Sequence, residues 1–519
     1  MRKYKYEITL FMMNALAMSL ELVASRLLSP YFGNANIVWT CIIGIILLSN
    51  SIGNVLGGKL SDKEVYKNNS KNVIKYMLVL IAATIYFIVV VHQGLIKAIT
   101  HITESVKIGS IIATVVLFLM PNILIGMLSP LILKLKLSEN TDEERIGKIG
   151  GNVYALGTIG SIVGTFASGF WLVPTFGCIN ILFVLIVICL LNSLILAEFK
   201  KSKEPIIYLL AILFMCFVLG MYIYSDNSIS KQILNGEVGP ELFLNTQYGS
   251  VRIFNTYTNK YDESIRVLEI EGGAESLSFN SDEHKYDILE GSYMDFYNQC
   301  LEANTNSINN MLLIGGAGYS FPKYVISHYP EKQIDVVEID EKITEVAKKY
   351  FYLDDLIKEY DLENNHRLNL IHDDGRMFVR NNTDKSYDLI LNDAFIGESP
   401  VATLTTVECI KDIKDCLSEN GYYIINIVSA YDGEHSKFIK AEMNTLKRVF
   451  KNVYCVDFKN RANPEDVNNS ILVATDGDFT IPPKAKLFNI DYSNGIVLTD
   501  DYCPVESLVS TRIKIKSWF

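Results

Sequence analysis

Apolar positions dominate the first 224 residues of the chain, where they form long runs separated by short polar stretches. A helix of about 20 apolar residues is long enough to cross the hydrocarbon core of a bilayer. The pattern predicts seven such helices, at residues 8–28, 37–57, 73–92, 108–133, 152–173, 179–197 and 206–224. We therefore predict a multi-pass α-helical membrane domain over residues 1–224.

The fifth of these runs contains the glycine-rich stretch GTIGSIVGTFASG, residues 157–169. Gly160 and Gly164 lie one helical turn apart, and two small residues at this spacing let helices approach closely. The stretch therefore predicts a packing seam between two helices.

Two ionisable residues, Glu21 and Arg26, lie within or at the end of the first predicted helix. An ionised side chain in lipid is costly unless it faces a partner or water. The two residues line a substrate path or form a structural pair near the interface, and the sequence favours neither interpretation.

Basic residues indicate which loops face the cytoplasm, because cytoplasmic loops carry an excess of Lys and Arg. They cluster before the first predicted helix and after the second, fourth and sixth. With seven helices this rule places the C-terminal half of the chain outside the cell. That half carries a glycine turn (Gly315, Gly316 and Gly318) followed by Glu338, which predicts a nucleoside ligand, and nucleosides are supplied inside. We expect the C-terminal half to face the cytoplasm from the cell membrane, and the conflict stays open at this point.

Beyond residue 235 the pattern changes to that of a soluble α/β protein. Residues 242–274 alternate apolar and polar positions between turn residues, which predicts a small antiparallel sheet within residues 235–300. Residues 301–519 then alternate strands with helices, beginning with the strand and turn MLLIGGAG and continuing with IDVVEID, LNLIHDDG, YDLILNDAF and GYYIINIVS. This order predicts a doubly wound, Rossmann-like sheet whose ligand lies at the carboxyl ends of the strands.

Composition narrows the classes of ligand. The net charge of −11 argues against a nucleic-acid partner. The nine cysteines form no CxxC pair and have no histidine at ligand spacing, so we expect reduced packing residues and no metal site.

The turn after the first Rossmann-like strand carries the most specific chemistry. Gly315, Gly316 and Gly318 allow the backbone to approach a ligand closely, and Glu338 at the end of the next strand is placed to accept both ribose hydroxyls. Asp374 could accept a hydrogen bond from an adenine amino group. A dinucleotide enzyme is the rival interpretation, but the turn is not GxGxxG and no second nucleotide-binding half follows.

These motifs resemble a known family. From Tyr248 to the C-terminus the chain is similar to spermidine synthases, the polyamine aminopropyltransferases of class I methyltransferase-like fold. The N-terminal half resembles the membrane region of the fused, integral-membrane members. The matching stretches are ELVASRLLSPYFG, GNVLGGKLSDK, GMLSP and YALGTIGSIVGTF before residue 224, and IEGGAES, LLIGGAGYSFPK, VVEIDEKITEVAKKYF, DDGRMF, LNDAF and LTDDYCPVE after residue 235.

The resemblance implies the ligand and the site. The ligand would be S-adenosylmethionine or its decarboxylated form, cleaved between sulfur and the propyl carbon to release methylthioadenosine without a metal. Asp393 would be the catalytic aspartate that takes a proton from the attacking amine, or it would only orient the sulfonium group. The ligand-binding set would comprise Gly315, Gly316, Gly318, Tyr319, Glu338, Asp340, Asp373, Asp374, Glu275 and Tyr293. The implied partners are the lipid bilayer, a nucleoside substrate and a second copy of the chain in a homodimer.

The chain departs from the family pattern at two acidic positions. The turn normally carries an Asp where this chain has Gly318, and a second Asp three residues after the catalytic one is replaced by Ile396. Glu275 replaces a Gln and could restore one negative charge. Because an ammonium group that leaves water needs a paired carboxylate, these changes disfavour a dicationic acceptor.

The altered pocket therefore predicts a reaction without an amine acceptor. The carboxylate of intact S-adenosylmethionine can attack the carbon that bears sulfur, closing homoserine lactone, and an intramolecular attack has a high effective molarity. We rank this lyase reaction slightly above aminopropyl transfer. Methyl transfer, and an S-adenosylmethionine-sensing transporter, are the remaining alternatives.

Overall fold

The computed structural model describes residues 4–32, 36–103, 105–138, 146–196, 220–221, 223–258, 263–396 and 399–509. The chain divides into two compact units. The first comprises Met1–Ile229 with Phe243–Val251, and the second comprises Ser230–Leu242 with Arg252–Phe519.

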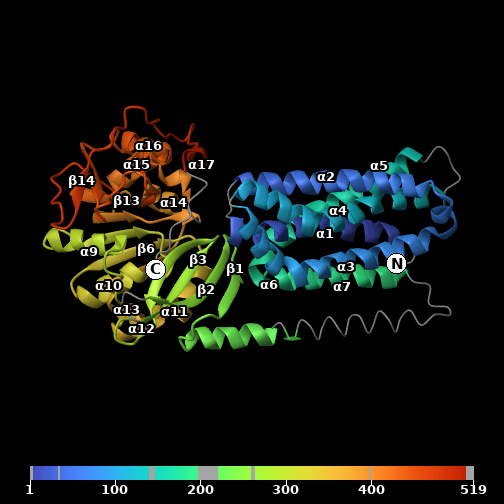
Figure 1. The fold of residues 1–519 in the computed structure, drawn as a ribbon, viewed down its shortest axis with the longest axis horizontal. Helices are drawn as coiled ribbons and strands as arrows, with labels where there is room; N and C mark the ends of the chain where they lie inside the picture. The colour runs from blue at the N-terminus through green and yellow to red at the C-terminus, as the bar shows by residue number, and fades with distance from the viewer. Residues whose placement is uncertain are drawn as a thin grey trace. The chain divides into compact units, whose positions relative to one another are not determined.

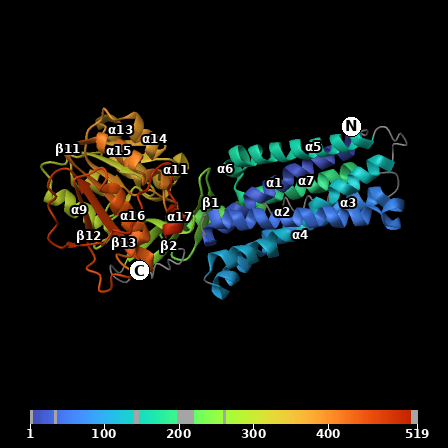
Figure 2. The ribbon, with the colours of Figure 1, turned by 90° about the horizontal axis from the view of Figure 1, so that it is seen from above.

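The first unit is a bundle of long apolar helices, which run alongside one another in Figures 1 and 2. Among the described residues, six helices are long and apolar enough to cross a membrane. They are α1 (Lys5–Phe32), α2 (Asn36–Ser61), α3 (Glu64–Ile102), α4 (Val106–Ser138), α5 (Ile146–Ala167) and α7 (Cys178–Leu196). Helix α5 continues through the π-helical turn Ser168–Leu172, and the short α6 (Val173–Phe176) precedes α7. For the seventh helix predicted at 206–224, residues 206–219 lie outside the described part of the chain. Residues 220–221 and 223–234 are helical.

Small residues on one face of α5 pack directly against α1. A Cβ atom at Gly160 would overlap the backbone oxygen of Phe11, and one at Gly164 would overlap the backbone oxygen of Ala15. One turn further on, Ser168 Oγ donates to Ser19 Oγ at 2.7 Å. The packing seam predicted from the glycine spacing is therefore present, because only a residue without a side chain allows this backbone approach.

We expect Gly164→Ala to destabilise the first unit, because the added methyl group must push α1 and α5 apart, and overpacking of this kind costs about 1 to 3 kcal/mol. Gly151→Ala, on the same helix, is the matched control, since a Cβ atom there would have no neighbour within 4 Å. Thermal unfolding of the detergent-solubilised chain should show a lower Tm for Gly164→Ala alone. Equal Tm values for the two variants would contradict the seam.

A small four-stranded sheet follows the helices along the chain, in the order β1-β2-β3-β4, and its strands β3 and β4 belong to the second unit. Its strands are β1 (Glu241–Asn245), β2 (Ser250–Thr258), β3 (Glu263–Ile270) and β4 (Gly273–Phe279). β3 and β4 are antiparallel, with Val267 opposite Leu277.

An eight-stranded sheet follows, in the order β14-β12-β13-β11-β8-β5-β6-β7. The strands β7, β6, β5, β8 and β11 are mutually parallel, and β13 is antiparallel to both β11 and β12. β5 and β8 are buried along almost their whole length, as expected for parallel strands covered by helices on both faces. The strands are β5 (Asn310–Ile314), β6 (Gln333–Glu338), β7 (Leu368–His372), β8 (Tyr387–Asn392), β11 (Leu417–Ser429), β12 (Asn452–Asp457), β13 (Asn468–Thr475) and β14 (Lys486–Phe488).

Helices connect these strands. The main ones are α9 (Tyr293–Ala303), α10 (Ser320–His328), α11 (Glu341–Tyr350), α12 (Leu353–Glu359), α14 (Gly375–Asn381), α15 (Val407–Asp415) and α16 (Lys437–Leu446). In this sheet β6 lies on one side of β5, and β8 lies on the other side. The strand order therefore reverses at β5, and ligands of open α/β sheets bind at such a point. The predicted Rossmann-like, class I methyltransferase-type fold is confirmed.

Candidate active site

A sharp glycine turn leaves β5 and lies against the turn that leaves β8. Gly315 has φ of +97°, and a Cβ atom there would come within 2.7 Å of the backbone oxygen of Asp393. The amide of Asp393 in turn donates to the carbonyl of Ile314 at 2.9 Å. Only glycine combines this dihedral angle with this backbone approach, so the residue brings the two strand ends together.

Glu338, the last residue of β6, holds this glycine turn. Its Oε2 accepts the amides of Gly316 and Ala317 at 2.9 and 3.0 Å, and its Oε1 accepts the amide of Asp340 at 3.0 Å. The side chain is 7% exposed, and burial raises the pKa of its carboxyl while the three amides oppose that rise. Three of the roughly four acceptor positions of a carboxylate are therefore occupied, so both ribose hydroxyls could bind only if a backbone amide were released.

The three predicted aspartates after β6 and β7 accept nearby backbone amides, and two of them cap helices. Asp340 begins α11, and its Oδ1 accepts the amide of Lys342 at 3.0 Å. Asp373 is exposed and accepts the amide of Asp374 at 2.8 Å. Asp374 begins α14 and accepts two amides through Oδ1, both at 3.0 Å. Within the described chain its Oδ2 has no hydrogen-bond partner, so Asp374 keeps one oxygen for a donor such as an adenine amino group.

Asp393 follows β8 and is held by side chains from two other elements. Its Oδ1 accepts from Nδ2 of Asn426 on β11 at 2.9 Å, and the hydroxyl of Tyr293 on α9 donates to the same carboxyl group. Burial raises the pKa of Asp393 to about 6, and the two hydrogen bonds limit that rise. A carboxyl group that titrates near neutral pH is suited to accept a proton during a reaction.

Of the predicted ligand-binding residues, Tyr293 bonds to this aspartate and Glu275 lies within electrostatic reach of Tyr293. Burial raises the pKa of Tyr293 well above its usual range, and the negative charges of Asp393 and Glu275 raise it further. The structure therefore brings Glu275, Tyr293 and Asp393 together from β4, α9 and the end of β8.

Other predicted residues serve the turn itself. The side chain of Tyr319 is fully buried, and its hydroxyl is 2.8 Å from Thr344 Oγ1. Its ring packs under the turn, where a Cβ atom at Gly316 would come within 2.8 Å of Tyr319 Cζ. The amide of Gly318 donates to Ser276 Oγ at 2.9 Å, and a Cβ atom at Gly318 would come within 2.7 Å of Ser276 Cβ. An aspartate at position 318 would therefore displace Ser276.

Asn426 and Ser276 are site residues that the sequence pattern did not indicate. Asn426 is a lone polar residue in the apolar run GYYIINIVS, and that interruption is a signal that could have identified it. Ser276 carried no comparable signal, because polar residues alternate throughout its strand.

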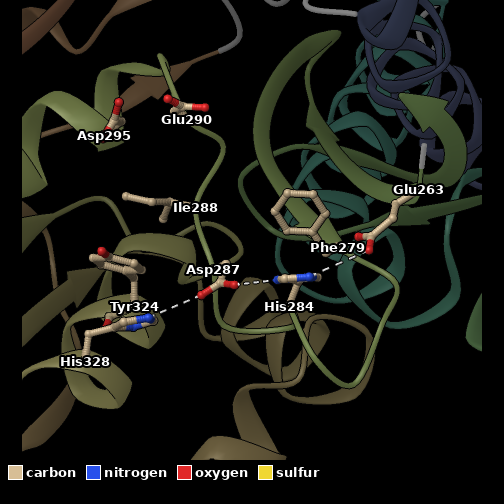
Figure 3. A pocket seen from close by; sticks show the side chains of 9 residues that line it. All are labelled: Glu263, Phe279, His284, Asp287, Ile288, Glu290, Asp295, Tyr324 and His328. Atoms are coloured by element: carbon tan, nitrogen blue, oxygen red, sulfur yellow. Dashed lines mark hydrogen bonds and ion pairs between the residues drawn. The ribbon is translucent and has the colours of Figure 1, made fainter. Parts of the chain in front are cut away.

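A separate cavity of about 390 Å³ lies beside α10 and the end of β4 (Figure 3). Asp287 stands between two histidines there: His284 Nδ1 is 2.8 Å from its Oδ2, and His328 Nε2 is 3.3 Å from its Oδ1. The hydrogen bond with Asp287 raises the pKa of His284. The cavity is lined by none of the residues predicted for the nucleoside site. Nor do the described residues contain a group of three or more His, Cys, Asp or Glu placed to hold a metal ion.

Comparison with known proteins gives a consistent family. Residues 299–479 match the spermine/spermidine synthase domain model. A polyamine aminopropyltransferase of Vibrio vulnificus is 30% identical over 166 residues, which cover 32% of this chain and 49% of that protein. One from Clostridium botulinum is 28% identical over 216 residues, which cover 38% of this chain and 74% of that protein. A probable spermidine synthase of Corynebacterium glutamicum aligns in structure over 48% of this chain and 93% of its own, with 20% identity and a TM-score of 0.40.

The second unit is thus a Rossmann-like domain of the methyltransferase fold. Residues 299–479 are similar to the spermine/spermidine synthase domain, and the six long apolar helices fit a fused membrane region. Its aligned segment spans about half of the Vibrio relative.

We expect Glu338→Ala to open the glycine turn, because it leaves three amides without their acceptor. A buried donor left unpaired costs about 1 to 3 kcal/mol. Hydrogen exchange of the full chain should show lost protection at residues 316–317, with a lower Tm. Asp373→Ala, which removes an exposed carboxylate, should change the protection and the Tm only slightly. Equal protection and equal Tm in the two variants would contradict the role of Glu338.

Proposed function

We propose that the second unit transfers an aminopropyl group from decarboxylated S-adenosylmethionine to an amine and releases methylthioadenosine. The observation that carries this proposal is the half-buried Asp393, whose pKa of about 6 suits it to take a proton. The names of the similar proteins, polyamine aminopropyltransferases, support the same reaction.

The chemistry assigns Asp393 a defined step. Asp393 accepts a proton from the bound ammonium group, which leaves a lone pair on the nitrogen. The nitrogen then forms a bond to the propyl carbon while the carbon–sulfur bond breaks, and sulfur keeps the electron pair as a neutral thioether. The product leaves as a secondary ammonium. Tyr293 and Asn426 orient the carboxylate, and Asp374 offers Oδ2 to the adenine amino group. The apolar helices anchor this unit at a membrane, and we keep the expectation of a cytoplasm-facing homodimer as part of the proposal.

A lactone-forming cleavage of intact S-adenosylmethionine is the second candidate. It is favoured by Gly318, because Ser276 fills the space that a carboxylate for the aminopropyl ammonium would need. In that reaction the substrate's own carboxylate oxygen attacks the carbon and no proton has to be removed. A proton acceptor at Asp393 would then have no task. The family match and Asp393 therefore favour transfer over the lactone reaction that the sequence pattern ranked first.

We expect methylthioadenosine to form only when decarboxylated S-adenosylmethionine and an amine such as putrescine are both supplied to the full chain. Chromatography of the products, with each component omitted in turn, checks this. Release of methylthioadenosine from intact S-adenosylmethionine alone, with homoserine lactone as co-product, would establish the second candidate instead.

We also expect the rate to fall below about pH 6, because Asp393 must be deprotonated to accept a proton. One pH unit below its pKa, about a tenth of the carboxyl groups is ionised, so kcat/KM should fall roughly tenfold. The ionisation of the amine lies several units higher and does not obscure this inflection. Tyr293→Phe removes a hydrogen bond that lowers the pKa, so the inflection should move to higher pH. If the inflection does not move, the hydroxyl of Tyr293 does not lower the pKa of the titrating group.

A further inference from the structure

A second tyrosine of α9 faces the candidate active site. Tyr297 lies four residues after Tyr293 and therefore on the same face of the helix. Its ring packs edge-on against the ring of Tyr293, with centroids 5.5 Å apart, and against that of Phe321 at 5.4 Å. The ring of Tyr297 is thus fixed between two aromatic neighbours.

The hydroxyl group of Tyr297 has no protein partner within the described part of the chain, although the side chain is 0% exposed. Burial raises the pKa of Tyr297 well above its usual range, and the charge of Asp393 raises it further, so the hydroxyl lies within electrostatic reach of that carboxylate. A buried hydroxyl without a partner lowers the stability of the empty protein. A ligand that bonds to it would offset this cost.

We propose that Tyr297 determines specificity for the acceptor, its hydroxyl oxygen accepting one N–H of a primary amine while Asp393 accepts another. This inference rests on the proposed aminopropyl transfer. The faces of the two tyrosine rings add a cation–π attraction for an alkylammonium group.

The charges around Asp393 define the substrate class further. Its hydrogen-bond partners Asn426 and Tyr293 are neutral, and Ser276 occupies the space in which a carboxylate at position 318 would lie. Glu275 adds a second carboxylate within electrostatic reach of Tyr293, so two carboxylates and two phenol groups suit an aliphatic diamine such as putrescine. A primary amine offers enough N–H groups for both Asp393 and Tyr297.

Tyr297→Phe tests this inference, because it removes the hydroxyl and keeps the ring. Putrescine is titrated calorimetrically into the full chain saturated with methylthioadenosine. We expect the variant to bind putrescine about threefold to tenfold more weakly, the range for one neutral hydrogen bond. Its affinity for methylthioadenosine should not change, and its Tm should stay the same or rise because an unpaired buried hydroxyl is removed.

Tyr422→Phe is the matched control. The hydroxyl of Tyr422 donates to the carbonyl of Asp478 at 3.1 Å, so its removal should lower the Tm and leave putrescine binding unchanged. Unchanged putrescine affinity in Tyr297→Phe, or a lower Tm with no effect on binding, would overturn the role of Tyr297 and leave aminopropyl transfer standing. If the wild-type chain binds methylthioadenosine but no putrescine, both the inference and amine transfer are contradicted.

Discussion

The contact between the backbone turns that follow β5 and β8 constrains the whole candidate site. Gly315 approaches Asp393 so closely that a single Cβ atom would separate the turns. Glu338 then binds the next two amides of the glycine turn and fixes its path. Because the backbone is fixed at this point, Asp393 projects toward α9 and β11, where Tyr293 and Asn426 meet it.

The buried Glu338 and the half-buried Asp393 have different tasks because their hydrogen-bond donors differ. Glu338 is surrounded by backbone amides, which cannot move without unfolding the turn, so its first role is structural. Asp393 is bound by the side chains of Asn426 and Tyr293, which can adjust when a proton arrives. Desolvation raises the pKa of both groups, but only Asp393 combines that rise with the surroundings of a proton acceptor.

A close approach between two backbones also occurs in the first unit, where it packs α5 against α1. Along α5, Gly160, Gly164 and Ser168 recur every four residues and meet α1. Helices in a membrane gain little from the hydrophobic effect against one another, so van der Waals contact and a hydrogen bond between serines carry the association.

The sequence by itself determined the architecture of both units. Long apolar runs indicated the membrane helices, and the strand and helix alternation after residue 301 indicated the Rossmann-like sheet, because both patterns are local consequences of burial. It also indicated Gly315, Glu338 and Asp393, since these residues end consecutive or adjacent strands.

Only the tertiary structure decided what each residue contacts. It made Asp340 a helix cap and Asp373 an acceptor of the next backbone amide, and it buried the Tyr319 ring in the core. It also brought Asn426, Ser276 and Tyr297 to the site from distant segments. These roles depend on side-chain directions and on pairing between strands far apart in the chain. A spacing along the sequence cannot specify them, because the same spacing is compatible with many three-dimensional neighbours.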